Sequence, residues 1–381
     1  MTAPAYLTRW RTIYQTANPL PGAPLDLVSR WMLITRACVF NMTLFSGLVG
    51  VMLAAQLGAG VVDPLDATLV VVGLLLAHAG NNMVNDFFDT VHGVDTADYP
   101  RANYAPHPLM HGLVSETRLL VAISICYLAD LLIAAWFAQK IGIIIWYFVL
   151  VGLAISIFYV AKPLRLKSLG LGEIGIFLVW GPLMVGGAFW ALAGNVATEA
   201  QLQEAMMVSV PYGLTVMAVV MGKHMDKHDD DSRKHIRTLP VLLGLRGAAR
   251  LTQLLIWTFF PVCFWLALPT DAPLVGGGGH PFMALGMLAL ARAMLCTRML
   301  GQPVPATPQE AFRIAFDAMP DNLKEGRTPD DPPEEYPIWP LWYVAWAFHF
   351  VKLGGLLFTL GLVLDTLWQR GALPECVENQ S

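Results

Sequence analysis

The sequence predicts an all-α protein embedded in a membrane, with nine transmembrane helices around a central apolar cavity. Of its 381 residues, 56% are hydrophobic and only 14% are charged, whereas a soluble protein usually carries about 25% charged residues. The mean hydropathy is +0.54, and the apolar residues gather in runs long enough to cross a bilayer, which takes about 20 residues. The net charge of −4 is too small to indicate a nucleic-acid partner.

The chain divides into four parts. Residues 1–31 form a proline-rich segment whose basic and tryptophan side chains suit a membrane surface. Residues 32–298 are expected to hold eight helices, at 32–58, 65–88, 118–138, 141–161, 172–193, 206–223, 251–269 and 281–298. Residues 299–338 form a polar insertion, and residues 339–381 hold the ninth helix, at 339–365, and a short tail.

A first acidic stretch ends the second helix, where the chain leaves the membrane. Asn85 is followed by Asp86, Asp89 and Asp95. Carboxylates this close repel one another unless a cation neutralises them, and oxygen ligands suit Mg²⁺, which commonly bridges to substrate phosphates. The ordinary alternative is a polar loop that caps the helix, but a second acidic stretch argues against it.

The second acidic stretch follows the sixth helix and contains Asp226, Asp230 and Asp231. Asp226 and Asp231 would lie about 140° apart on a straight helix, so pairing them requires the helix to unwind between them. Asp226 and Asp230 would instead be neighbours on one face. Both pairings remain possible, and the first is favoured because it keeps the spacing to residues 237–240.

Cationic and polar side chains are expected beside these carboxylates. Tyr159 and Lys162 follow the fourth helix, and on a helix they would share one face. The ordinary reading of a lysine at a membrane edge is that it extends to the lipid headgroups. Together with Arg36, Arg101 and Lys223, these two residues are the candidates for binding an anionic group.

The distribution of Lys and Arg predicts the orientation of the chain. Almost all of the 24 Lys and Arg residues lie in the N-terminal segment or in loops that follow even-numbered helices. Only Lys140 and Arg370 fall on the other side, with Lys352 inside the bilayer. The positive-inside rule therefore places the N-terminus and both acidic loops in the cytoplasm, in a multi-pass protein of the inner cell membrane.

These features together favour a polyprenyl diphosphate as substrate. Metal ions held by carboxylates would neutralise a diphosphate, and cationic side chains would stabilise the charge of the departing group. A cavity within the bilayer would receive a long hydrocarbon tail.

The motifs resemble those of the UbiA superfamily of intramembrane prenyltransferases, nine-helix proteins with two Asp-rich motifs. The resemblance depends on the run Asn85-Asp86-Phe87-Phe88-Asp89, which matches N-D-x-x-D, on Tyr159-x-x-Lys162, which matches Y-x-x-K, and on Arg36 near the start of the first helix. The continuation through Gly93 and Asp95 is similar to the branch that prenylates 1,4-dihydroxy-2-naphthoate in menaquinone synthesis.

The second motif departs from the family pattern of D-x-x-x-D before a Thr-Leu pair. Alignment on Thr238-Leu239 puts Asp231 at the second carboxylate but Lys227 at the first, so that Asp226 would have to serve from one position earlier. A lysine beside the metal site is unexpected, and so is the insertion at 299–338.

The resemblance implies Mg²⁺-dependent transfer of a polyprenyl group from a prenyl diphosphate to an aromatic, quinone-precursor-like acceptor within the bilayer. It implies one ion on Asn85 and Asp89 with Asp86 or Asp95, and a second on Asp226 with Asp231 or Asp230. The diphosphate would be bound by Arg36, Tyr159, Lys162, Arg101 and Lys223.

Other classes of protein remain open at this point. A terpene cyclase of the same superfamily would consume prenyl diphosphate without an aromatic acceptor. A polytopic transporter would use intramembrane Asp and Lys for proton coupling and would need no Mg²⁺. A metal-binding membrane protein is a third alternative, because the two acidic loops also hold histidines, which favour Zn²⁺ or Ni²⁺: His92, His107, His111, His224, His228 and His235.

Overall fold

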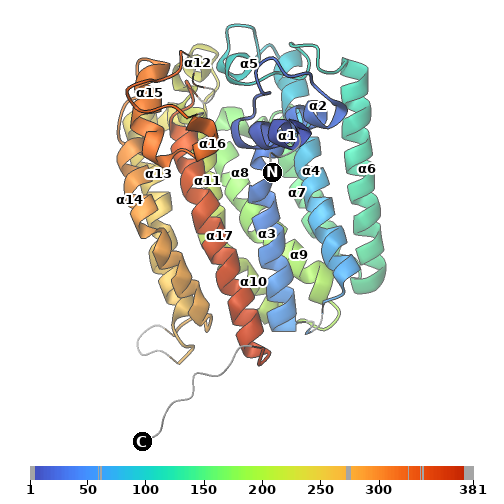
Figure 1. Ribbon diagram of the computed structural model, residues 1–381. Coiled ribbons are helices and arrows are strands. Elements are labelled where there is room, and N and C mark those ends of the chain that lie inside the picture. Colours follow the sequence, from blue (N-terminus) through green and yellow to red (C-terminus); the bar gives the residue numbers. More distant parts are fainter. Residues whose placement is uncertain are drawn as a thin grey trace, which may run out of the picture.

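The fold is a bundle of long helices with short helices gathered toward one end (Figure 1). The computed structural model describes residues 5–372 apart from 59, 61, 272–275, 325, 335, 337 and 338, and within these residues it contains helices and no strand. The prediction of an all-α fold is confirmed. The tail at 373–381, expected outside the cell, lies beyond the described residues.

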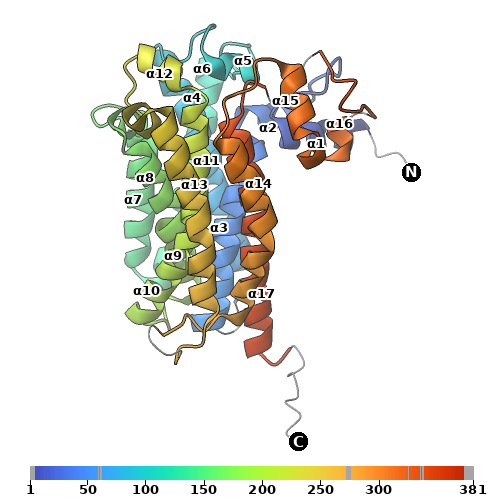
Figure 2. The same ribbon diagram turned by 90° about the vertical axis from the view of Figure 1, so that its left-hand side faces the viewer.

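The long elements stand side by side along the bundle (Figures 1 and 2). In chain order they are α3 (Phe40–Leu53), α4 (Pro64–Val91), α6 (Glu116–Ile141), α7 (Ile144–Phe158), α8 (Gly172–Leu178) with α9 (Met184–Ala193), α10 (Glu199–Val208) with α11 (Val210–Met225), α13 (Leu239–Ala267), α14 (Leu290–Leu300) and α17 (Tyr343–Gln369). A 3₁₀ helix, Pro281–Ala289, leads into α14.

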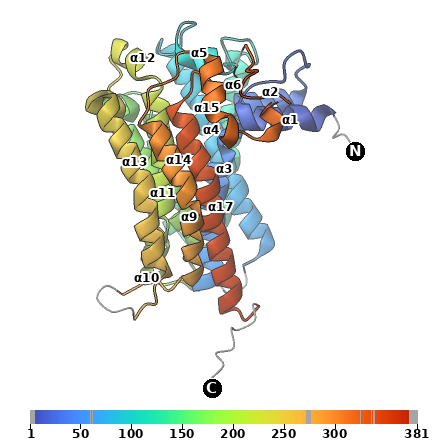
Figure 3. The same cartoon turned by 60° about the vertical axis from the view of Figure 1, so that its left-hand side comes forward.

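The short helices lie toward one end of the bundle, which we call the site end (Figures 2 and 3). They are α1 (Ala5–Thr16), α2 (Leu27–Ile34), α5 (Pro100–Tyr104), α12 (His228–Arg233), α15 (Pro308–Ala315) and α16 (Asp321–Lys324). The last helix, α17, ends at the opposite end of the bundle (Figure 1). The insertion expected at 299–338 therefore contributes α15 and α16 to the site end.

The helices have the length and composition of membrane spans. Seven of those described are long and apolar enough to cross a membrane, or eight if α10 and α11, which meet at 41°, form one span. The shorter apolar helix α7 accompanies them. These segments correspond to the nine that the sequence predicts, although the number of nine crossings itself stays a prediction.

The first span is broken, where the sequence predicts one helix over 32–58. Helix α2 ends at Ile34, Arg36 adopts a left-handed φ of 55°, and α3 begins only at Phe40 after one 3₁₀ turn. A left-handed backbone costs a residue other than glycine roughly 1–2 kcal/mol. Here it accompanies an ion pair of the Arg36 side chain with Asp86 on α4.

Glycines permit close contacts between the long helices. A Cβ atom on Gly50 of α3 would lie 2.5 Å from the Cβ atom of Ala188 on α9. A Cβ atom on Gly222 of α11 would lie 2.7 Å from the backbone of Tyr343 on α17. Such contacts stabilise membrane helices by van der Waals packing, since lipid supplies no hydrophobic driving force between them.

An apolar cavity lies among α4, α6, α7 and α9. It contains about 920 Å³ of empty space, part of it open to the surroundings, and its walls are mainly apolar. Polar side chains are few there, and the residues nearest the site end on α4 are His78 and Asn81. We call this space the apolar cavity.

Candidate active site

A small polar pocket lies at the site end, close to the apolar cavity. Two of its residues come from α4, one from α5, one from α11 and one from the 3₁₀ helix Leu166–Leu169, and the others come from the segments between helices. Five cationic side chains and two carboxylates line it, so that it suits an anionic ligand. Its lining residues are Arg36, Asn85, Asp89, Asp95, Arg101, Tyr159, Lys167, Lys223 and Lys227.

One face of α4 connects this pocket with the apolar cavity. Asn81 lines the cavity and Asn85 lines the pocket, and residues four apart on a helix lie one above the other, about 6 Å along its axis. Both side chains are buried, and the Oδ1 atom of each has no hydrogen-bond partner among the described residues. Unpaired buried oxygens at this position are free to accept a ligand.

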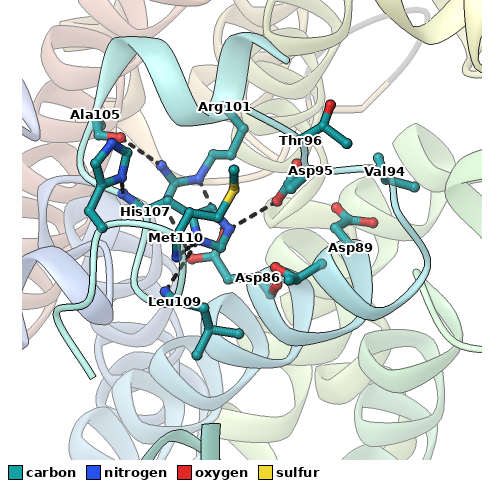
Figure 4. A network of polar contacts seen from close by, with 12 residues as sticks. Asp86, Asp89, Val94, Asp95, Thr96, Arg101, Ala105, His107, Leu109 and Met110 are labelled. Carbon is teal, nitrogen blue, oxygen red and sulfur yellow. Dashed lines mark hydrogen bonds and ion pairs between the residues drawn. The ribbon is translucent and has the colours of Figure 1, made fainter. Parts of the chain in front are cut away.

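Asp86 holds two arginines in place, and Figure 4 shows the contact with one of them, Arg101. Arg101 donates to both Asp86 oxygens, each at 3.2 Å, and Arg36 also donates to both. A carboxylate offers about four acceptor positions, and these four hydrogen bonds fill them. Asp86 is fully buried and does not line the pocket, so its geometry fits the positioning of arginines and not metal binding.

Asp95 reaches the pocket from the loop after α4. Its Oδ2 atom lies 3.2 Å from His107 Nε2, which lies 3.6 Å from Asp86. Burial raises the pKa of Asp95, but the His107 hydrogen bond and the charge of Lys227 lower it. The net result is a pKa below the ordinary value of an aspartate. Asp95 therefore remains an ionised ligand. Asp86, Asp95 and His107 are the group of possible metal ligands that lies together in the described chain, although Asp86 is fully occupied.

Asp89 and Lys167 form an ion pair at the pocket wall. The Lys167 ammonium donates to both Asp89 oxygens, at 2.6 and 2.8 Å. The sequence suggests Lys162 instead, on the assumption that it shares a helix face with Tyr159. That assumption is wrong, because α7 ends at Phe158. The chain then turns, leaving Lys162 exposed outside the pocket and burying Lys167 within it.

The acidic stretch after α11 contributes no carboxylate to the described pocket lining. Asp226 accepts the backbone N–H groups of Trp342 and Tyr343 at 3.0 and 2.8 Å and that of Val344 at 2.9 Å, so that it caps the start of α17. Asp230 pairs with the exposed Arg233.

Asp231 is buried and accepts a hydrogen bond of 2.5 Å from the hydroxyl of Tyr99. Burial raises the pKa of Tyr99, which keeps the phenol protonated as the donor. The predicted second metal site is therefore not assembled from Asp226 with Asp230 or Asp231.

Two lysines line the pocket instead, Lys223 near the end of α11 and Lys227 just after it. The sequence predicts Lys223 there, whereas Lys227 is the residue that departs from the family pattern. The Lys227 side chain is 5% exposed, and its ammonium lies 5.1 Å from the centre of the Tyr99 ring. Burial lowers the pKa of Lys227, but the electrostatic influence of Tyr99 and Asp231 raises it well above its ordinary value. The net shift favours the protonated form of Lys227.

Tyr159 is held by a buried chain of polar groups. Its hydroxyl lies 3.3 Å from His224 Nε2, and His224 Nδ1 lies 2.6 Å from Glu173 Oε1. Glu173 also accepts the backbone N–H of Leu239, at 3.2 Å. No pattern in the sequence links Glu173 with His224, because they come from helices about 50 residues apart.

A bundle of apolar helices with a cationic pocket beside an apolar cavity defines a membrane protein suited to an amphiphile with an anionic head. A sequence profile of the UbiA prenyltransferase family matches residues 43–316. The chain belongs to this family, and the prediction that it is a prenyltransferase enzyme is confirmed.

Individual relatives are distant but cover most of the chain. The 1,4-dihydroxy-2-naphthoate octaprenyltransferase of Bacillus subtilis (strain 168) is 23% identical over 237 residues, which cover 61% of this chain and 70% of that protein. The UbiA prenyltransferase domain-containing protein 1 of Dictyostelium discoideum is 27% identical over 257 residues, covering 65% and 74%.

The fold also matches a solved structure. The apo structure of a UbiA homologue from Aeropyrum pernix K1 superposes with a TM-score of 0.57 at 17% sequence identity, covering 86% of this chain and 97% of that chain. The arrangement of helices is thus that of the family.

Proposed function

We propose that the protein transfers a polyprenyl group from a prenyl diphosphate to an aromatic, quinone-precursor-like acceptor within the membrane. The observation that carries this proposal is the meeting of the cationic pocket and the apolar cavity along one face of α4. A prenyl diphosphate has the same two halves, an anionic head and a hydrocarbon tail. The name of the Bacillus subtilis relative, which acts on 1,4-dihydroxy-2-naphthoate, supports the aromatic acceptor.

The diphosphate would be bound by cations that are already oriented. Arg36 and Arg101 are held by Asp86, and Lys167 by Asp89. Guanidinium groups bind phosphate oxygens with short, charge-assisted hydrogen bonds. Because these donors are fixed before the substrate arrives, they stabilise the charge that develops on the departing diphosphate without reorganising.

The pocket fits one Mg²⁺ ion. Asn85 offers an unpaired buried oxygen, and the carboxylates of Asp89 and Asp95 line the same pocket. Oxygen ligands of this kind are those that Mg²⁺ prefers, with water and substrate phosphate filling the remaining positions. Asn85, Asp89 and Asp95 would hold the ion, and the ion when bound would neutralise part of the diphosphate charge.

The reaction breaks the bond between the first prenyl carbon and the diphosphate oxygen, and the electron pair leaves with the diphosphate. The cationic pocket stabilises that anion, while the apolar cavity keeps water from the allylic cation. A carbon of the electron-rich acceptor ring then forms the new bond and loses its proton. Tyr159, fixed by His224, faces the pocket where this step takes place.

The proposal includes an orientation. The site end would face the cytoplasm of a cell with the protein in its inner membrane, because Lys and Arg concentrate in the segments that form this end.

Mass spectrometry of the products tests the proposed function. The purified protein in lipid vesicles is incubated with Mg²⁺, prenyl diphosphates of increasing length and a panel of dihydroxynaphthoate-like and other aromatic acceptors. We expect a prenylated acceptor that disappears when the Mg²⁺ is chelated. A cyclised hydrocarbon formed without acceptor would indicate a terpene cyclase. Intact prenyl diphosphate under every condition would contradict prenyl transfer.

A further inference from the structure

The segment after α11 brings Lys227, and no carboxylate, to the described lining of the pocket. Asp226 is occupied by three backbone N–H groups of α17, and Asp230 by Arg233. Asp229 is exposed and lies 2.8 Å from His228. Asp231 is then the remaining carboxylate of the segment, and one of its oxygens accepts from Tyr99. A Mg²⁺ ion requires near-octahedral coordination by oxygen and is usually held by one or two carboxylates. Within the described segment, a second ion would therefore have one carboxylate available, that of Asp231, and one oxygen of this carboxylate already accepts a hydrogen bond.

The charges around Asp231 also disfavour a second metal ion. The ammonium groups of Lys227 and Lys234 lie 5.1 and 4.6 Å from the centre of the Tyr99 ring, whose hydroxyl donates to Asp231. These two positive charges would repel a divalent cation bound to Asp231, and a partly buried site screens that repulsion little. The free oxygen of Asp231 is therefore better matched to an ammonium group than to a metal ion.

Lys227 has the geometry of a ligand-binding cation. It lines the pocket and is 5% exposed, yet the described residues offer its ammonium no hydrogen bond or ion pair within the chain. An ammonium carries three donors, so that these donors remain for a ligand. Lys234, in contrast, donates to the Val94 carbonyl at 2.6 Å and to the Thr96 hydroxyl at 2.8 Å.

We propose that the Lys227 ammonium takes the place of a second metal ion, so that this enzyme binds the diphosphate with one Mg²⁺ ion and a fixed lysine. The inference depends on the proposed function, since it assigns Lys227 to the same diphosphate. It makes Lys227 a substrate-binding residue that contacts the diphosphate oxygens opposite Asn85, Asp89 and Asp95. Lys223, four residues earlier, also lines the pocket.

Counting bound metal ions tests the inference without any variant. The wild-type protein is saturated with geranyl thiodiphosphate, a substrate analogue that resists cleavage, and titrated with Mn²⁺ while free Mn²⁺ is followed by electron paramagnetic resonance. We expect one tightly bound Mn²⁺ per chain that depends on the analogue. Two such ions would overturn the inference and leave the proposed function intact. Failure of the analogue to bind at all would contradict both.

A set of variants tests Lys227 directly. Affinity for geranyl thiodiphosphate at saturating Mg²⁺ is measured by calorimetry for Lys227→Gln, Lys227→Arg and Arg233→Gln. Arg233 is the matched control, because it lies in the same segment and removes the same charge from an exposed site. We expect Lys227→Gln to bind at least about tenfold more weakly, as for the loss of a charge-assisted hydrogen bond.

In the same measurement, we expect Lys227→Arg to recover most of the affinity and Arg233→Gln to match wild type. Equal affinities of Lys227→Gln and Arg233→Gln would overturn the inference. If Lys227→Gln does not fold, the Mn²⁺ count on wild-type protein decides the question.

Discussion

Asp86 illustrates what single residues could and could not reveal in the sequence. The acidic run identified the right part of the chain, since Asn85 and Asp89 both line the pocket. The sequence could not assign Asp86 its role, because that role depends on Arg36, which lies 50 positions away, and on Arg101. Carboxylates of the same run look alike until their partners are known.

Lys167 and Lys162 provide the first prediction. We expect Lys167→Gln to raise the KM for the prenyl diphosphate about tenfold or more, because it removes a charge-assisted donor from the pocket. Lys162→Gln should change KM by less than about twofold, since an exposed lysine contributes little. Steady-state kinetics of the two variants is the measurement. A larger effect of Lys162→Gln would restore the interpretation that the sequence favoured.

Asp226 provides the second prediction. We expect Asp226→Ala to lower the free energy of unfolding by roughly 1–2 kcal/mol, because it removes the cap of α17. The Mg²⁺ concentration that gives half-maximal activity should stay unchanged. Thermal melts measure the loss of stability, and Mg²⁺ titrations of the activity of the folded protein measure the Mg²⁺ requirement. Asp230→Ala is the control. A raised Mg²⁺ requirement in Asp226→Ala alone would show that Asp226 is a metal ligand after all.

At the scale of elements, hydropathy located the spans but not the breaks within them. The left-handed residues Arg36 and Arg165, with φ of 55° and 48°, interrupt the chain at or near residues of the pocket lining. Arginine has no intrinsic preference for that conformation, so the local sequence carried no sign of either break. Arg36 and Lys167 take their places in the pocket beside these breaks, which explains why the pocket was predicted only in part.

The contact between α11 and α17 gives the third prediction. We expect Gly222→Val to lower the free energy of unfolding by about 1–3 kcal/mol, and with it the melting temperature. The added side-chain atoms would collide with the Tyr343 backbone. Gly152→Ala on α7 is the control, since no atom lies within 4 Å of its added Cβ. Fluorescence melts of the purified variants provide the measurement. Equal melting temperatures would mean that the two helices are not packed as described here.

At the scale of the whole molecule, the polar groups concentrate at one end and the apolar cavity lies along the bundle. The sequence predicted this arrangement because charged residues are costly inside the bilayer and therefore mark the helix ends. It did not predict that Asp226 would cap α17, since Trp342 is 116 residues away from Asp226. Because of that contact, the Asp226 carboxylate is held at the start of α17 and is not part of the described pocket lining.

Orientation is the fourth prediction. In a cysteine-free background, we expect an impermeant maleimide added to intact cells to label Ala372→Cys and not Thr8→Cys. Both positions are exposed on the protein and belong to the two ends of the described chain. The reason is that Lys and Arg are concentrated toward the site end, where α1 lies (Figure 2). The reverse labelling pattern would place the pocket outside the cytoplasm.

The most direct measurement is the amount of pyrophosphate released and of prenylated acceptor formed in the same reaction. If the pocket cleaves the diphosphate while the cavity holds the prenyl chain for transfer, both products should appear in a ratio of about one to one. Their formation should require acceptor and Mg²⁺, and Asp89→Asn should lose both together. Pyrophosphate released without acceptor, or undiminished activity in Asp89→Asn, would contradict the account.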